Sequence, residues 1–170
     1  MRDSDVLDNN PQISRSALEA MHGQVFGWAL SRCNYEQPVA EDLVQQAYVE
    51  LLSGKARFDG ASSLKTFVFA VVQNLARNRY RKMSSRLRLA GELRAEAGGA
   101  ATQPVEPGET SGIWDAVQRL PQRQRDIMEL VFCRDMTIEE ASRVMGVSTG
   151  TGRVHYDRAK KALRSKLADE

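Results

Sequence analysis

Cysteine and histidine are scarce in this 170-residue chain, which has two of each. Cys33 and Cys133 belong to no CxxC-like ligand spacing, so we expect reduced thiols and no zinc or other metal site. His22 and His155 lie far apart in the sequence, and neither combines with a serine, cysteine or aspartate into a recognisable catalytic set. The sequence therefore predicts a protein that is not an enzyme and that holds no cofactor.

Long apolar runs are also absent. No stretch approaches the roughly 18 residues of a membrane-spanning helix, and the first twelve residues are polar and acidic, unlike a secretory signal. We expect a soluble, cytoplasmic chain without membrane insertion.

Only five prolines occur, which leaves room for long helices. The length suits one ordinary domain or two small helical ones.

Net charge is small, at +2, but the basic residues are unevenly distributed. Seven lie between Arg77 and Arg94 against one acidic residue, and six lie between Arg153 and Lys166, again against one. Two basic segments in a nearly neutral chain indicate two places that touch a polyanion. Two solvated helix faces are the alternative that charge alone leaves open.

Three amphipathic helices are predicted in the N-terminal half. Apolar residues recur at three- and four-residue steps over about 14–33, and again from about residue 39 to a stop at Gly54, where Glu41 and Asp42 suit the helix start. The third helix begins after Ser62 or Ser63. It has an apolar stripe first and a basic segment, "QNLARNRYRK", afterwards. Its stripe is predicted to comprise Leu64, Phe67, Val68, Val71, Val72 and Leu75.

Residues 95–112 lose all periodicity and are rich in Gly, Ala, Pro, Ser and Thr, which predicts a flexible linker. It separates a domain at about 12–94 from a domain at about 113–168. In the second domain, Thr137 and Glu140 form a capping box, Gly146 suits a helix end, and Ser148 suits the next helix start. We therefore expect an all-α protein whose C-terminal domain is a helix-turn-helix.

The last helix has distinct inner and outer faces. At about 100° per residue, Tyr156, Ala159 and Leu163 point inward together with Gly152, while a cationic sector points outward. Arg153 lies in that sector near the helix start and is the best candidate for reading a guanine. Gly152 removes apolar contacts and costs about 1 kcal/mol in helix propensity. We accordingly expect Gly152→Val to stabilise this domain.

These segments resemble the sigma factors of bacterial RNA polymerase, and specifically the extracytoplasmic-function (ECF) group of the sigma-70 family. The resemblance runs from "AEDLVQQAYVELL" and "FDGASSLKTFVFAVVQNLARNRYRK" to "LPQRQRDIMELVF" and "TIEEASRVMGVSTGTGRVHYDRAKKALR". It implies binding to the beta and beta-prime subunits of core polymerase, melting of the downstream promoter element, reading of the upstream element, and a possible anti-sigma factor. Phe67, Asn78 and Gly152 stand where the family usually has Trp, Asp and Val.

The resemblance also implies three sets of site residues. Polymerase binding is expected at Glu41, Asp42, Gln45 and Gln46. Downstream-element binding is expected at Asn74, Arg77, Asn78, Arg81 and Lys82. Upstream-element binding is expected at Ser148, Thr149, Thr151, Arg153, Val154, Asp157, Arg158 and Lys161.

Two rival functions fit fewer of these features. "STGTG" lacks the lysine of a phosphate-binding P-loop and no strand precedes it. A dimeric helix-turn-helix regulator that binds operator DNA without core polymerase would account for the C-terminal half. It leaves the basic third helix and the face bearing Asp42 and Gln45 unexplained.

Overall fold

The computed structural model describes residues 13–91 and 111–169, and these residues are helical with no strand. The chain divides into two compact units, Met1–Ala101 and Thr102–Glu170, whose described parts we call the N-terminal and C-terminal units. The expectation of an all-α protein is confirmed. Of the expected linker, Ser111 and Gly112 belong to the first helix of the C-terminal unit, and residues 95–110 lie outside the described ranges, as does residue 12.

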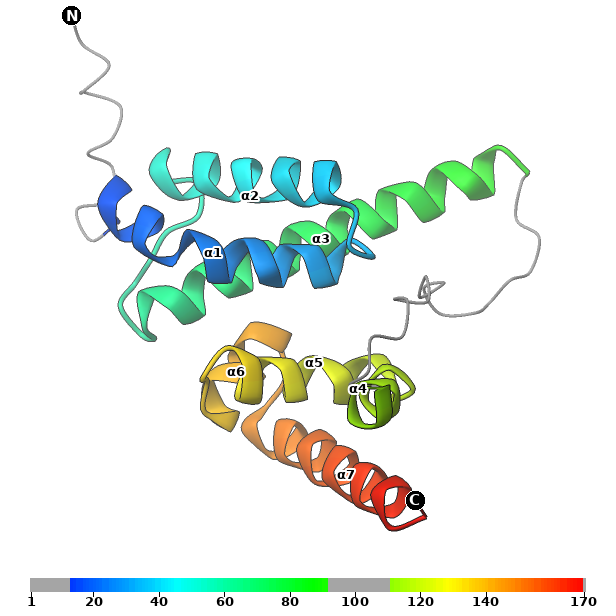
Figure 1. Ribbon diagram of the computed structural model, residues 1–170. Helices are drawn as coiled ribbons and strands as arrows, with labels where there is room; N and C mark the ends of the chain where they lie inside the picture. Colours follow the sequence, from blue (N-terminus) through cyan, green and yellow to red (C-terminus); the bar gives the residue numbers. More distant parts are fainter. Residues whose placement is uncertain (1–12, 92–110, 170) are drawn as a thin grey trace, which may run out of the picture. The chain divides into compact units, whose positions relative to one another are not determined.

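The N-terminal unit consists of three helices, α1 (Arg15–Arg32), α2 (Gln37–Leu52) and α3 (Leu64–Leu89), each of which packs against the other two (Figure 1). Serine side chains begin two of them. Ser14 accepts the main-chain N–H of Ala17, and Ser63 accepts that of Thr66. Each cap satisfies an amide that the helix itself leaves without a partner.

Trp28 is the largest side chain in the core of this unit and is fully buried. Its ring stacks on Phe69 of α3 with centroids 5.9 Å apart, and its indole N–H donates to the carbonyl oxygen of Phe69 at 3.3 Å. The guanidinium carbon of Arg32 lies 4.1 Å from the Trp28 ring centroid. Trp28 therefore joins α1 to α3 through apolar burial, ring stacking and a hydrogen bond at once.

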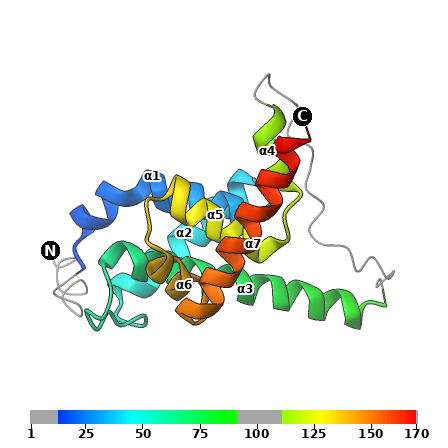
Figure 2. The same ribbon diagram turned by 90° about the horizontal axis from the view of Figure 1, so that it is seen from below.

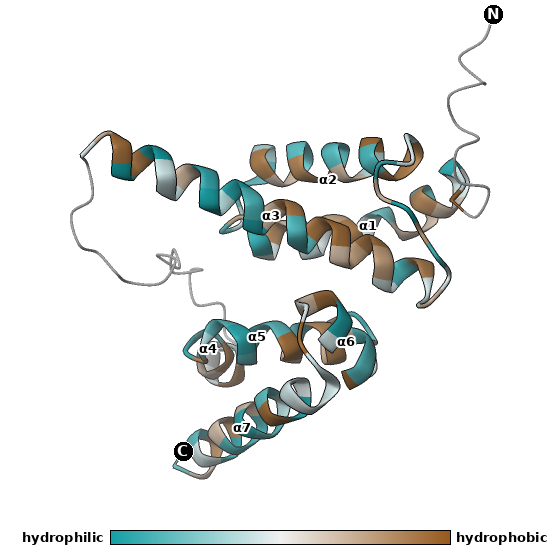
Figure 3. Ribbon diagram, turned by 180° about the vertical axis from the view of Figure 1, so that it is seen from behind, coloured by the Kyte–Doolittle hydropathy of each residue, from teal (hydrophilic) through white to brown (hydrophobic). Residues whose placement is uncertain are grey.

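α3 extends well past the other two helices (Figures 1 and 2). The part that packs against α1 and α2 is largely hydrophobic, whereas the projecting part is largely hydrophilic (Figure 3), with arginine and leucine alternating in its final turn. The predicted change from core helix to cationic helix within one element is therefore present, and the core half anchors the cationic half.

Two details of the N-terminal unit differ from expectation. α2 begins at Gln37, with Pro38 in its first turn, so Glu41 and Asp42 lie a turn inside the helix and do not mark its start. In α3, Phe69 is fully buried whereas Phe67 is only half-buried and packs against Phe58, with centroids 5.2 Å apart. The buried face is wider than the predicted stripe because α1 and α2 cover α3 from two sides.

The C-terminal unit comprises α4 (Ser111–Gln118), α5 (Gln122–Met128), a π-helical turn η1 (Glu129–Cys133), α6 (Ile138–Met145) and α7 (Thr149–Ala168). α7 packs against α4, α5 and α6. Its inward positions Ala159 and Leu163 are buried as predicted, while Tyr156 is only half-buried. The core that they join includes the fully buried Ile127 and Leu130.

The helix-turn-helix has the predicted caps. Thr137 and Glu140 form both hydrogen bonds of the capping box, at 3.1 and 2.8 Å. Gly146 ends α6 with φ 69°, in the left-handed region that glycine adopts without strain. The hydroxyl of Ser148 accepts the main-chain N–H of Thr151 at the start of α7. These local signals fix the three residues between α6 and α7.

The expectation for Gly152 is wrong. A Cβ atom at this position would lie 3.0 Å from Ser142 Cβ and far inside van der Waals contact with Ser142 Oγ. Ser142 belongs to α6, is 1% exposed, and donates its hydroxyl to the carbonyl oxygen of Ile138 at 2.6 Å. The space that valine methyls would occupy is therefore already filled, and Gly152 is the residue that lets α7 approach α6.

We predict that Gly152→Val destabilises the protein by about 1–3 kcal/mol, the usual cost of overpacking a close contact. Urea unfolding measures this free energy. Ser142→Ala in the same chain should restore part of the loss, because it removes the hydroxyl but leaves Cβ in place. Gly150→Ala is the matched control: a Cβ there meets only Ser148 Oγ, at 4.0 Å, so helix propensity should raise stability by up to about 1 kcal/mol. A stabilising Gly152→Val would contradict the proposed contact.

Candidate polymerase and nucleic-acid interfaces

The four residues predicted to bind polymerase lie on the outer side of α2, and all four are exposed: Glu41, Asp42, Gln45 and Gln46. Leu43, Val44 and Ala47 alternate with them and are buried. Burial of these neighbours fixes the rotation of α2 about its axis. The surface of α2 therefore presents two carboxylates and two side-chain amides, which suit a basic, polar partner.

The residues predicted to bind the downstream element begin at the end of the core stripe of α3 and continue beyond it. Asn74, Asn78, Arg81 and Lys82 are exposed, and Arg77 is half-buried. At about 100° per residue, the set apart from Lys82 spans roughly 100° of the helix surface, and Lys82 lies just beside it. The structure therefore places two amides and three cations on one face, which can combine base-edge contacts with attraction for phosphates.

Arg79 points away from that face, since it continues the line of Val72 and Leu75 towards the end of α1. Burial raises the pKa of the Cys33 thiol, and the nearby guanidinium groups of Arg79 and Arg32 oppose that rise. Beside Cys33, Asn34 and Tyr35 both have positive φ, of 52° and 61°. The basic segment is thus divided: the guanidinium of Arg79, although exposed, lies near Cys33 at the end of α1, and other cations lie on the outer face.

α7 holds the residues predicted to bind the upstream element. Thr149 is half-buried, and the others are exposed: Ser148, Thr151, Arg153, Val154, Asp157, Arg158 and Lys161. Two of them also serve the helix cap, because the Ser148 hydroxyl donates to Thr151 Oγ1 at 2.9 Å. Asp157 lies 3.6 Å from the ammonium of Lys160. The second and third turns of α7 therefore expose Arg153, Val154 and Asp157 at the surface of the unit.

One cluster beside α7 is absent from the sequence-based site. Phe132 of η1 stacks on Tyr156 with centroids 6.1 Å apart, and the ammonium of Lys160 lies 4.5 Å from the Tyr156 ring centroid. Tyr156 was predicted to be an inward-facing core residue and Lys160 one of several outward cations. The helical wheel contained no signal for the contact, because Phe132 comes from a different helix with π rather than α geometry.

The chemistry available at these surfaces is that of hydrogen bonding and charge. Burial raises the pKa of the Cys133 thiol as well as that of Cys33, which disfavours the nucleophilic thiolate near neutral pH. His22 bonds Tyr48 through Nδ1 at 3.0 Å, joining α1 to α2. Within residues 13–91 and 111–169, no three His, Cys, Asp or Glu side chains gather into a metal site, and no helix is apolar enough to cross a membrane.

A three-helix unit with an exposed acidic face and a long cationic helix, together with a helix-turn-helix unit, defines a two-part DNA-binding protein. Two family models match the same two units: sigma-70 region 2 over residues 17–86 and sigma-70 region 4 over residues 111–163. The chain belongs to the sigma-70 family of RNA polymerase sigma factors and, within it, to the ECF group of promoter-recognition factors.

Curated relatives extend over most of the chain. The ECF RNA polymerase sigma factor EcfG of Rhodopseudomonas palustris is 29% identical over 133 residues, which cover 75% of this chain and 71% of EcfG. The ECF RNA polymerase sigma factor SigF of Caulobacter vibrioides is 26% identical over 161 residues, which cover 95% of this chain and 89% of SigF.

Solved structures share the fold. The sigma factor RpoE of Bartonella quintana, in complex with the anti-sigma factor NepR, matches with a TM-score of 0.69 and 21% identity, covering 91% of this chain and 96% of RpoE. CnrH, in complex with the cytosolic domain of CnrY, matches with a TM-score of 0.59 and 21% identity, covering 91% of this chain and 88% of CnrH. At these identities the likeness concerns the arrangement of helices.

Proposed function

We propose a division of labour between the surfaces of this sigma factor: α2 binds core RNA polymerase, α3 melts and holds the downstream promoter element, and α7 reads the upstream element. The observation that carries the proposal is the presence of both a region 2 and a region 4 unit in one chain, each with its predicted contact face exposed. The domains at about 12–94 and 113–168 have these roles, and residues 95–112 join them.

The test of the function as a whole is reconstituted transcription. The purified chain, added to core polymerase, should bind it and direct initiation from a specific promoter. A dimeric operator-binding regulator would instead bind duplex DNA without core enzyme. That function does not explain the presence of a region 2 unit. Binding to an operator with no binding to core polymerase would overturn the proposal.

The proposed work involves binding and DNA opening, and it requires no active site or cofactor in this chain. Because polymerase and promoter DNA are the proposed partners, we place its action in the cytoplasm. Two solved neighbours are complexes, one of them with an anti-sigma factor. We propose that a protein of this kind restrains the present chain by competing with core polymerase.

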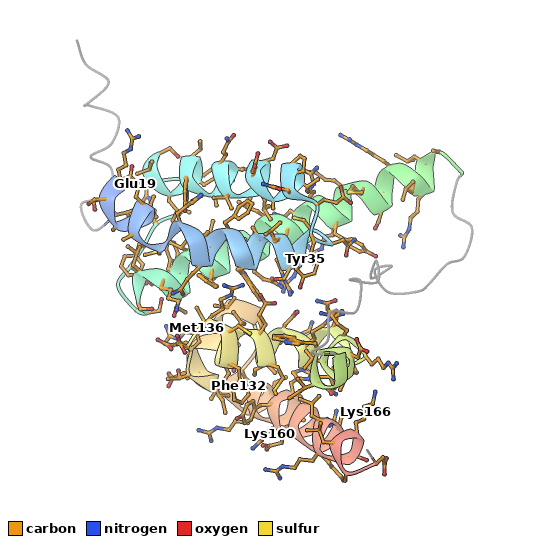
Figure 4. All side chains as sticks on the ribbon, in the orientation of Figure 1. Glu19, Tyr35, Phe132, Met136, Lys160 and Lys166 are labelled. Atoms are coloured by element: carbon orange, nitrogen blue, oxygen red, sulfur yellow. The ribbon has the colours of Figure 1, made fainter. Side chains whose placement is uncertain are left out.

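The exposed carboxylate of Asp42 is expected to face a basic partner surface. Asp42→Arg should reduce the affinity for core polymerase at least tenfold, because it replaces attraction with like-charge repulsion across the interface. Binding can be measured with fluorescently labelled protein, and circular dichroism should report an unchanged fold. Glu19→Arg is the matched control, since Glu19 is an exposed carboxylate on α1 that forms an ion pair with Arg15 on its own helix (Figure 4). Equal effects of the two reversals would refute a specific role for Asp42.

Asn74 is expected to bind the edge of a base in the melted nontemplate strand. Asn74→Ala should slow open-complex formation on duplex promoters about tenfold or more, and should leave core binding unchanged. Permanganate reactivity of unpaired thymines measures opening. Ser85→Ala is the control, because Ser85 is exposed on the same face of α3 three turns further along. Normal opening by the Asn74 variant would remove this residue from the site.

Arg153 is exposed in the second turn of α7 and is the candidate base reader. Arg153→Ala should cost about 1–3 kcal/mol on the preferred upstream element and relax the preference at one base pair. Competition among DNA duplexes that differ at single positions measures this preference. Arg164→Ala, on the same face three turns later, should weaken all duplexes equally. The same uniform loss from Arg153→Ala would reassign Arg153 to a phosphate.

A further inference from the structure

Two contacts join the beginning of the π-helical turn η1 to the residue that follows its end. The main-chain N–H of Arg134 donates to the carbonyl oxygen of Glu129 at 3.2 Å, and the Arg134 guanidinium contacts the Glu129 carboxylate, also at 3.2 Å. Both side chains are less than one-fifth exposed, so water screens their attraction weakly. A π turn holds one more residue per hydrogen bond than an α turn, which changes the direction of the side chains within it.

Phe132 lies inside this turn, with 60% of its surface exposed. It does not fill the core; instead its ring stacks on Tyr156, halfway along α7, with an angle of 19° between the ring planes. Stacked aromatic pairs at this separation attract one another beyond simple burial. Through this stack, the η1 turn restricts the position of Tyr156 near the middle of α7.

Tyr156 in turn supports Lys160. The ammonium lies over the ring at 4.5 Å from its centroid and 3.6 Å from the Asp157 carboxylate. At about 100° per residue, Lys160 lies within roughly 40° of the line through Arg153 and Arg164. Lys160 therefore belongs to the DNA-facing side of α7 and has a position that is already restricted. Phe132 and Lys160 lie near each other beside α7 (Figure 4).

We propose that Lys160 binds a backbone phosphate at the edge of the upstream element, and that Phe132 is a positioning residue which acts on Lys160 through Tyr156. The proposal rests on the proposed DNA-reading role of α7. Lys160 lies about three turns beyond the start of α7. Residues that far along a recognition helix lie towards the sugar-phosphate backbone, whereas those in the first turns reach bases. A lysine side chain held on an aromatic ring loses less conformational freedom on binding than an unrestrained one, so the stack should increase affinity.

The experiment measures the affinity of the complex with core polymerase for promoter DNA over a series of salt concentrations. Lys160→Gln should lower affinity equally on all upstream sequences and reduce the slope of log affinity against log salt by about 1. Phe132→Ala should lower affinity by about two- to fivefold without changing the slope, because it loosens the Lys160–Tyr156 contact and an exposed cation–π contact has about that value. Lys166→Gln is the control for charge, since Lys166 is an exposed cation in the last turn of α7.

A double-mutant cycle separates positioning from mere packing. In the Lys160→Gln background, Phe132→Ala should have no further effect on DNA affinity. In the parental chain, Tyr156→Phe should retain the affinity, because it keeps the aromatic ring. If Phe132→Ala lowers affinity equally in both backgrounds, its role is structural and the positioning role is overturned. An unchanged salt slope for Lys160→Gln overturns the phosphate contact. A parental complex that ignores the upstream sequence overturns the proposed function together with this inference.

Discussion

The approach of α7 to α6 at Gly152 and Ser142 is the constraint on which the C-terminal unit depends. The Ser142 side chain leaves no room for a Cβ at position 152 of α7, and the Ser142 hydroxyl is bound to its own helix. Because the two helices are in such close contact, the rotation of α7 about its axis is fixed. That rotation decides that Arg153 and Lys160 face outward while Ala159 and Leu163 face the core.

In the N-terminal unit, a bulky residue determines how one helix is oriented on another. Trp28 binds α3 by stacking and by a hydrogen bond to the main chain at Phe69, and this contact sets the register of α1 on α3. The two units thus orient their cationic helices α3 and α7 in opposite ways: the C-terminal unit lacks a side chain at the contact, and the N-terminal unit buries a large one. In both units, the close-packed contact on the buried side of the helix determines which of its residues are exposed on the other side.

The sequence predicted the elements whose signals are local. The capping box at Thr137 and Glu140, the left-handed Gly146 and the Ser148 cap each need only a few neighbouring residues, and each is present. Periodicity likewise predicted the buried Val68, Val72 and Leu75. The exposure of the site residues followed from the same pattern, because a helix that buries one face must expose the other. Their roles at the interfaces remain proposals.

Contacts between helices could not be predicted in this way. The role of Gly152 depends on its contact with Ser142, ten residues earlier in the sequence. Helix propensity and the helical wheel contain no information on that contact, so they predicted that Gly152→Val would stabilise the protein. The start of α2 was misplaced because an acidic pair resembles a first turn, although Pro38 marks it more directly. The π turn at Glu129–Cys133 has no strong sequence signature, and so the stack of Phe132 on Tyr156 emerged only from the three-dimensional arrangement.

The continuity of α3 has a mechanical consequence. Its 26 residues form a single rod about 39 Å long, half embedded in the bundle and half outside it. A rod held at one end transmits any tilt of the held end to the free end, magnified by distance. Small cavities or shifts around Phe69 or Val72 would therefore displace the cationic face by more than they disturb the core. Substitutions deep in the bundle would then change what the cationic face can contact, although the altered side chains lie far from that face.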